Sequence, residues 1–555
     1  MIKKIKIKNI VLLLSLLMMT GCDFMDCDES DNFTKQEVLD SYNRVKQLAT
    51  NVYGFLKADF CSIDGAMLDA ATDDAVHIYK SSNIQRFVDG TWSANNLVDN
   101  VWGHYYEGIR AANFYLKETA GLTFDEWKYS DDYEAIMKEF TNYQYEVRFL
   151  RAYFYFELIK RYRNIPFVLD VLAQNEANGV NPESYEKIAK FIVDECSDLA
   201  QILPVNYDNF STKEKGRVTR AAAMALKSRV TLYMASPLFS EDSEDKWKQA
   251  AEAAYDIIKQ KTDLGLDLVP YPQIFNDVNN QKAEVILYRP TGESGDFEKA
   301  NFPIGVEGGK TSTCPTQNLM EAYDMKDGTP FVWNNQSNPY DNRDPRMEMT
   351  IAVNGEKWPD TNPNPLEIYI GGRNALPIAG ATPTGYYLKK YLDKTIDISA
   401  STSSGGKRHN WITYRLGEFY LNYAEAVFNY LGSADAVSTE FTMSAREAVN
   451  VVRNRSDVQM PEVPEGLTNN QFVEKYRRER MVELAFEQHR FWDVRRWKAG
   501  DTQRSIVQMQ ITKNNDTYTY KRVISNRYWD DKMYLFPIPD SEIRKNPNLI
   551  QNPGW

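Results

Sequence analysis

Aromatic residues flanked by amide side chains occur in three polar stretches of the sequence. Trp92 is followed by Asn95 and Asn96 in "DGTWSANN". Tyr79 lies in "HIYKSSN" and Trp333 in "FVWNNQSNPY". A ring offers a flat apolar face, and an amide both donates and accepts hydrogen bonds, so the combination suits stacking against a polar ring such as a sugar. The alternative is that each ring packs onto the body of the protein.

The groups that perform catalysis in enzymes do not form a recognised motif here. The sequence contains no G-x-S-x-G, H-E-x-x-H or G-x-G-x-x-G pattern. Its four histidines and five cysteines lack metal-ligand spacing, so we expect no metal and no cofactor. The adjacent acids Asp73 and Asp74 are interpreted as solvated surface residues. We expect a protein that is not an enzyme, although 77 acids leave a glycosidase carboxylate pair open.

The N-terminal residues have the pattern of an export signal. Four lysines precede an apolar run at residues 10–19, which is too short to cross a bilayer that needs about 20 residues. Gly21 directly before Cys22 resembles a bacterial lipobox, in which the cysteine thiol receives a diacylglycerol. We therefore expect residues 1–21 to be a signal peptide and Cys22 to be the lipid anchor. The alternative is a signal cleaved elsewhere, with Cys22 a plain thiol.

An acidic stretch follows the cysteine. Residues 22–34 hold Asp23, Asp26, Asp28, Glu29 and Asp31, and such a composition predicts a solvated tether. It also resembles the acidic export signal of surface lipoproteins. The chain has a formal charge of -12, which becomes -16 when the four lysines of the signal are removed. This charge argues against nucleic acid or an anionic lipid surface as a partner.

Helical periodicity dominates both ends of the remaining chain, and small residues beside large aromatics indicate stacked helix pairs of the tetratricopeptide type. Plain αα-hairpins would give the same pattern. We predict a mainly α protein with an N-terminal helical region at 35–288 and a C-terminal one at 416–555. The predicted helices cover residues 35–56, 97–118, 133–162, 182–203, 217–235, 246–261, 418–431, 444–455 and 470–497.

The middle of the chain has a different composition. Residues 289–415 contain 11 of the 23 prolines and 13 of the 28 glycines, which excludes long helices. We predict an irregular, loop-rich subdomain with short strands. Ordered loops on a rigid frame are common places for binding sites.

The C-terminal helical region contains an unusual mixture of charge and aromatic surface. In "YRRERMVELAFEQHRFWDVRRWK" (476–498), Arg480, Glu483, Glu487 and Arg490 recur at three- and four-residue steps. This spacing predicts that they share one helix face. Tryptophans among the arginines imply burial beside those charges. We interpret the segment as an architectural ion-pair network, with ligand binding as the alternative.

This segment resembles the signature of the SusD/RagB family, "RxxELxFEGxRxWDLRRW", and departs from it at Gln488, where glycine is usual, and at Val494. "YLFPIPDSEIRKNPNLIQNPGW" (534–555) is similar to the family's ending "PIPxxEixxNPxLxQNPGY". Residues 97–116 resemble its first core helix. Together with the lipobox, these matches extend from Cys22 to Trp555.

The resemblance implies a fold of tetratricopeptide-like helix pairs with loop-rich additions. It also implies an outer-membrane lipoprotein, facing the exterior, that binds a glycan and passes it to a SusC-like TonB-dependent transporter. Some relatives bind peptides instead. The motifs lie away from the candidate ligand residues, so none of these is taken from the family. The sequence is also compatible with a surface glycoside hydrolase or with a helical scaffold that contacts only proteins.

Overall fold

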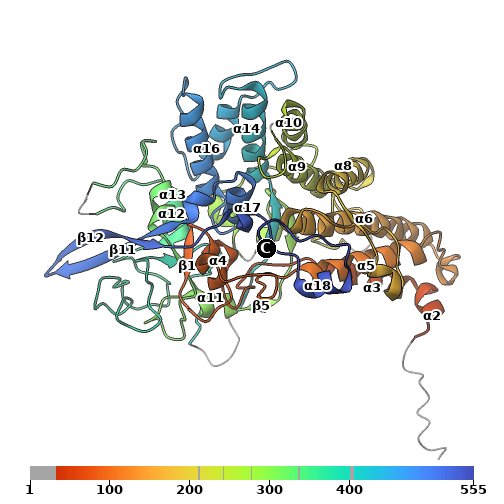
Figure 1. Cartoon of the computed structure of the whole chain (residues 1–555), viewed down its shortest axis with the longest axis horizontal. Helices are drawn as coiled ribbons and strands as arrows, with labels where there is room; N and C mark the ends of the chain where they lie inside the picture. Colours follow the sequence, from red (N-terminus) through yellow and green to blue (C-terminus); the bar gives the residue numbers. More distant parts are fainter. Residues whose placement is uncertain (1–32, 211–212, 242, 277, 335–337, 400–405) are drawn as a thin grey trace, which may run out of the picture.

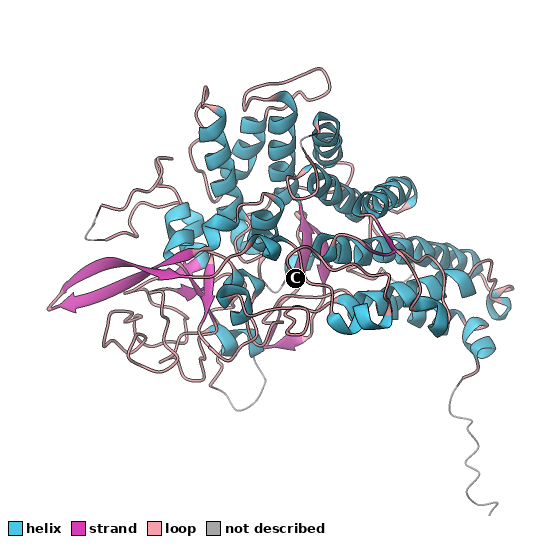
Figure 2. Cartoon of the chain, in the orientation of Figure 1, coloured by secondary structure: helices cyan, strands magenta, loops and turns pink. Residues whose placement is uncertain are grey.

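A computed structural model of the chain describes residues 33–210, 213–241, 243–276, 278–334, 338–399 and 406–555. The long helices gather on one side, and short helices, strands and loops occupy the other (Figures 1 and 2). The predicted signal, Cys22 and all of the acidic tether before Phe33 lie outside the described residues. Within the described ranges, no helix has the length and apolarity needed to span a bilayer.

Helices form most of the regular structure, in agreement with the predicted class. The helices before residue 270 are α2 (Lys35–Leu39), α3 (Tyr42–Tyr53), α4 (Gln85–Asp89), α5 (Trp102–Glu118), α6 (Tyr133–Tyr162), α7 (Gln174–Ala177), α8 (Tyr185–Ile202), α9 (Arg220–Ala235) and α10 (Glu244–Lys259). The later helices are α11 (Asp296–Asn301), α12 (Gln317–Ala322), α13 (Pro345–Thr350), α14 (Leu416–Leu431), α15 (Ala445–Arg453), α16 (Asn469–Glu483), α17 (His489–Arg496) and α18 (Asp540–Lys545).

The strands of the described chain pair two by two, and every pair is antiparallel. They include one long hairpin, β11 with β12, which extends away from the body (Figure 1). The pairs are β1 (Ala75–His77) with β6 (Thr313–Pro315), β2 (Ile165–Pro166) with β3 (Pro182–Glu183), β4 (Val285–Arg289) with β10 (Trp411–Arg415), β5 (Glu293–Ser294) with β9 (Lys407–Arg408), β7 (Ile351–Ala352) with β8 (Tyr387–Leu388), and β11 (Ser505–Asn514) with β12 (Thr517–Asn526).

Two hydrophobic cores hold these elements together. The first lies among the helices, where α6 is buried around its circumference from Phe149 to Tyr162. Such a helix must be covered on all sides, and α3, α5, α8 and α9 contact it. The second core lies in the loop-rich part and also draws residues from positions 67–75 and 458–520. The prediction of a mainly helical fold of helix pairs, with short strands in a loop-rich part, is confirmed.

The predicted helix at 470–497 is divided into α16 and α17. The chain turns at Phe486 and Gln488, whose φ angles of 59° and 67° lie in the left-handed region that glycine adopts most easily. The expectation that Arg480, Glu483, Glu487 and Arg490 share one helix face is therefore wrong. The hairpin of β11 and β12 is an element that helical periodicity did not predict.

Candidate functional site

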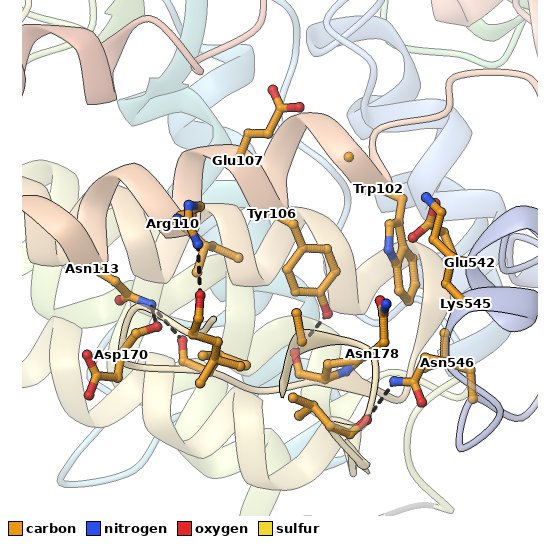
Figure 3. Close-up of a pocket in the computed structure, with 18 residues that line it drawn as sticks. Trp102, Tyr106, Glu107, Arg110, Asn113, Asp170, Asn178, Glu542, Lys545 and Asn546 are labelled. Atoms are coloured by element: carbon orange, nitrogen blue, oxygen red, sulfur yellow. Dashed lines mark hydrogen bonds and ion pairs between the residues drawn. The ribbon is translucent and has the colours of Figure 1, made fainter. Parts of the chain in front are cut away.

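A cavity of about 370 Å³ lies between α5, the segment 166–180 and α18 (Figure 3). Its volume falls in the range of small-molecule sites, roughly 300–1,000 Å³. Its wall combines aromatic, aliphatic, amide and charged side chains. The lining residues are Trp102, Gly103, Tyr106, Glu107, Ile109, Arg110, Asn113, Pro166, Val168, Asp170, Leu172, Ala177, Asn178, Val180, Glu542, Lys545, Asn546 and Leu549.

Helix α5 supplies one wall of the cavity. Trp102, Tyr106, Arg110 and Asn113 follow one another at four-, four- and three-residue steps, which places them on one helix face. The Trp102 and Tyr106 rings lie 5.2 Å apart between centroids at an angle of 51°. The helix therefore presents two neighbouring aromatic rings followed by polar groups along a single line, as Figure 3 shows.

The segment 166–180 forms the opposite wall and is fastened to α5 by side-chain hydrogen bonds. The Tyr106 hydroxyl donates to the Pro166 carbonyl over 2.8 Å, and Arg110 Nη1 donates to the Leu172 carbonyl over 3.0 Å. The Asn113 amide donates to the carbonyls of Val168 and Asp170, each over 3.1 Å. These bonds satisfy backbone carbonyls that the irregular segment could not pair internally.

Helix α18 and the residues after it close the cavity. The Asn546 amide donates to the Val180 carbonyl over 2.8 Å, and Lys545 forms an ion pair with Glu542 at 2.8 Å. Residues 166–180 are thus held from both sides, by α5 and by the C-terminal segment (Figure 3).

The cavity combines a neutral phenol with an ionised carboxylate. Burial raises the pKa of Tyr106 well above its ordinary value, so its hydroxyl stays protonated. The hydrogen bond from Lys117 lowers the pKa of Asp170, so that carboxylate stays ionised. The Glu107 and Asn178 side chains are exposed and make no hydrogen bond to another described residue, which leaves them available to a ligand. The arrangement offers aromatic surface and hydrogen-bonding groups, and the carboxylates of Glu107, Asp170 and Glu542 line its wall.

Trp92, predicted as an exposed stacking residue, is 2% exposed. Its ring packs edge-on against Phe87, Phe536 and Trp555, with centroid distances of 4.6, 5.0 and 4.6 Å. The exposure on which its predicted ligand role depended is therefore contradicted. Its polar sequence neighbours do not cover it; aromatic residues from the far C-terminal segment do.

The other predicted ligand residues lie apart from one another. Tyr79 is 41% exposed, and its hydroxyl donates to the Lys310 carbonyl over 2.7 Å. Trp333 is half-buried and lies 6.5 Å from Phe331 between ring centroids. None of the predicted ligand residues lines the cavity of Figure 3.

Asn95 and Asn96 close a short turn after Trp92. The Asn96 side-chain amide donates to the Thr91 carbonyl over 3.0 Å, and its backbone pairs with Ser93. Asn95 is exposed. A contact between these residues and a ligand stays a prediction.

Trp102 and Tyr106 are the residues that sequence reasoning missed. They lie within the predicted helix 97–118, where aromatic residues suggest core packing. The sequence did contain a sign of this partly exposed face. Aromatic and polar side chains follow one another along the same helix face, instead of occupying opposite faces. That mixture indicates a face that is only partly buried.

The adjacent carboxyls Asp73 and Asp74 are buried, contrary to the interpretation of solvated acids. Asp73 accepts two hydrogen bonds from Arg490, over 2.8 and 2.7 Å. Burial opposes ionisation of Asp73, but Arg490 outweighs it and lowers the pKa. Burial and the neighbouring Asp73 raise the pKa of Asp74 well above its ordinary value. Asp74 is fully buried.

A third buried acid, Asp69, gives a testable pH dependence. Burial, and then the nearby Asp59, raise the pKa of Asp69 to about 7, against roughly 3.9 in an unfolded chain. Protonated Asp69 therefore contributes to the free energy of unfolding. This contribution is fully present below about pH 4 and is lost as the pH rises through about 7. Asp69→Asn cannot ionise, so we expect its stability to rise relative to wild type by about 2–3 kcal/mol between pH 4.5 and 7.5.

Urea unfolding at the two pH values measures this change. The exposed Asp131→Asn serves as the control for removing one carboxylate. An equal difference for Asp69→Asn at pH 4.5 and 7.5 would show that Asp69 does not hold its proton.

Residues 476–498, which resemble the family signature, form a buried ion-pair network between the two cores. This confirms the predicted architectural role of the segment. Glu483, which is fully buried, accepts hydrogen bonds from Arg346, Arg415 and Arg455 at 2.9, 2.8 and 2.7 Å. Glu487 accepts from Arg415 at 2.7 Å. The partners are distant in sequence and come from both parts of the molecule.

Comparison with known proteins shows the same family that the motifs resemble. The model of the SusD family matches residues 274–555, and a second model, described as starch-binding associating with outer membrane, matches residues 23–232. The "SusD-like protein P25" of Formosa agariphila is 22% identical, over 99% of this chain and 98% of that protein.

Solved structures of similar proteins have the same fold. A SusD-like protein from Bacteroides fragilis superposes with a TM-score of 0.77 at 27% identity, over 94% of this chain and 99% of its own. A SusD-like carbohydrate binding protein from the same species gives a TM-score of 0.72 at 24% identity, over 92% and 100%. The chain belongs to the SusD family.

Proposed function

We propose that the protein is a lipid-anchored component of the outer cell surface that binds an oligosaccharide or polysaccharide. It would deliver this glycan to a SusC-like TonB-dependent transporter. The observation that carries the proposal is the cavity of Figure 3, where the Trp102 and Tyr106 rings lie beside amide and charged groups. The carbohydrate-binding relative and the family description that refers to starch and the outer membrane support it.

The chemistry of the cavity suits a sugar. The half-buried Tyr106 ring and the accessible edge of Trp102, which is 6% exposed, can contact the apolar face of a sugar ring, while Asn178 and Glu107 hydrogen-bond its hydroxyls. Stacking of one ring contributes on the order of 1–2 kcal/mol, so two rings with a few hydrogen bonds give millimolar to micromolar affinity. Such affinity allows release to a transporter.

Affinity electrophoresis of purified protein through gels containing a panel of polysaccharides tests the binding. We expect at least one polysaccharide to retard wild type, and Trp102→Ala to weaken that retention about tenfold, since 1.4 kcal/mol corresponds to that factor. Trp127→Ala removes a tryptophan outside the cavity and should bind like wild type. Asn178→Ala, in an exposed loop, tests the cavity without disturbing the core.

Retention of Trp102→Ala and Asn178→Ala equal to wild type would place the ligand elsewhere. A panel in which no polysaccharide is retained, together with binding on a peptide array, would support a peptide ligand. Turnover of a labelled oligosaccharide by the purified protein would indicate a hydrolase.

The anchor and the transporter have their own tests. Metabolic labelling with palmitate should mark wild type and should fail with Cys22→Ala. Added protease should cleave the protein on intact cells, and affinity purification from membranes should recover a TonB-dependent transporter. An unlabelled wild type would remove the proposed anchor.

A further inference from the structure

Arg477, which is half-buried on α16, is an arginine without a carboxylate partner. In the part of the chain that the structure describes, no Asp or Glu oxygen lies within 4.0 Å of its guanidinium, whereas Lys475, Arg478 and Arg480 on the same helix each have one. Its Nε atom is buried and makes no hydrogen bond. The guanidinium interacts with the neighbouring Tyr476 hydroxyl, but its Nε–H donor is left without an acceptor among the described residues.

The Trp497 indole holds Arg477 in place. The guanidinium carbon lies 4.5 Å from the centroid of the ring, and the Trp497 N–H donates to Glu425 over 2.7 Å. Arg496 lies 4.7 Å from the same centroid. The guanidinium lies over the face of the indole, which restricts its position, and its N–H groups can meet a bidentate acceptor.

Arg477 borders a second cavity, of about 440 Å³, between α12, α16 and residues 497–502. Arg490 also lines it but is neutralised by Asp73. Arg478 is 35% exposed and reaches Asp324 only at 3.7 Å, while Lys475 and Arg453 hold the other oxygen of that carboxylate. Arg477 and Arg478 therefore face the cavity, and each can still pair with an additional anion.

The acids of this wall do not supply that anion. Glu321 is engaged by Arg522 at 2.9 Å. Glu474 lies one turn before Arg477 and is exposed, with no cation within 4.0 Å among the described residues. The rest of the wall contains the apolar Ala322 and Met481 and the polar Asn318 and Thr502.

We propose that this cavity binds the carboxylate of an acidic sugar, with Arg477 as the bidentate donor and Arg478 as a second cation. A guanidinium matches the planar carboxylate in geometry and charge. The Trp497 edge and Met481 supply apolar surface for the sugar ring, and the Asn318 amide can meet a hydroxyl. The inference rests on the proposed glycan binding and specifies a uronic acid as one component of the glycan.

Calorimetric titration with trigalacturonate and with α-1,4-linked galactotriose tests this, because the two differ only in a carboxylate in place of the CH₂OH group on each of the three rings. We expect wild type to bind trigalacturonate at least tenfold more tightly. Arg477→Ala should remove that preference, and Arg477→Lys should restore part of it, since an ammonium supplies charge but no fork of donors. Lys521→Ala, which removes an exposed cation from β12 outside the cavity, should retain the full preference.

Equal affinity of wild type for the two trisaccharides would overturn the inference without any variant. An undiminished preference in Arg477→Ala, with a thermal melting curve like that of wild type, would also overturn it. Retention of neutral polysaccharides without acid preference leaves the proposed function intact and removes this inference alone. If the protein binds triglutamate in a way that depends on Arg477, and binds no sugar, then both the proposed glycan ligand and the proposed acidic sugar are wrong.

Discussion

Replacing Glu483 with glutamine is expected to lower the free energy of unfolding by about 3–5 kcal/mol, the cost of removing one member of a buried ion-pair network. The Glu483 carboxylate accepts from three guanidiniums and is fully buried. Burial alone would raise its pKa, but Arg455, Arg415 and Arg346 outweigh burial and hold the pKa well below its ordinary value. The amide would leave those cations buried with one partner fewer.

Urea unfolding followed by tryptophan fluorescence at pH 7 measures this loss. Glu474→Gln is the matched control, because Glu474 lies on the same helix but is exposed and forms no ion pair with a described residue. Its effect should stay within about 0.5 kcal/mol. A loss below 1 kcal/mol for Glu483→Gln would mean that the network does not join the two cores.

Trp92→Ala is expected to cost about 3–5 kcal/mol of stability, because truncation of a buried tryptophan leaves a cavity that its neighbours fill poorly. Trp92 is enclosed by Phe87, Phe536 and Trp555. Tyr79→Ala, at an exposed position, should cost about 1 kcal/mol or less, the value of its single hydrogen bond to the Lys310 carbonyl.

Chemical unfolding of the two variants separates a structural residue from a ligand residue. If Trp92→Ala unfolds like wild type and yet loses glycan retention, Trp92 acts on the ligand and its packing is dispensable. The expected outcome is the reverse: reduced stability and, below the unfolding transition, retained glycan binding.

The helices were predictable because their signal is local. The predicted helix 133–162 coincides with α6, whose apolar residues recur over thirty positions. The break between α16 and α17 was not predicted, because it depends on left-handed backbone angles at Phe486 and Gln488 that periodicity does not report. The usual glycine of the family signature at position 488 is explained by that angle.

The proposed binding surface was much less predictable, because the exposure of a side chain depends on partners far away in the sequence. Trp92 has polar neighbours and appeared exposed, but Phe536 and Trp555 cover it. Trp102 is a residue of the first core and is 6% exposed, yet segment 166–180 and α18 also build a cavity against its edge. Local composition describes neither arrangement.

The long separation between paired elements determines the order in which the chain can assemble. Strand β1 cannot pair until β6, more than 230 residues later, has been synthesised. Asp73 likewise cannot form its ion pair until Arg490, 417 positions away, is present. Helix pairs can form from nearby residues, whereas the second core requires residues 458–520. A nascent chain interrupted before residue 458 would thus contain helices but would expose apolar surface and uncompensated arginines. Such fragments are suitable substrates for chaperones and proteases, which gives the cell a physical means to distinguish a finished molecule from an incomplete one.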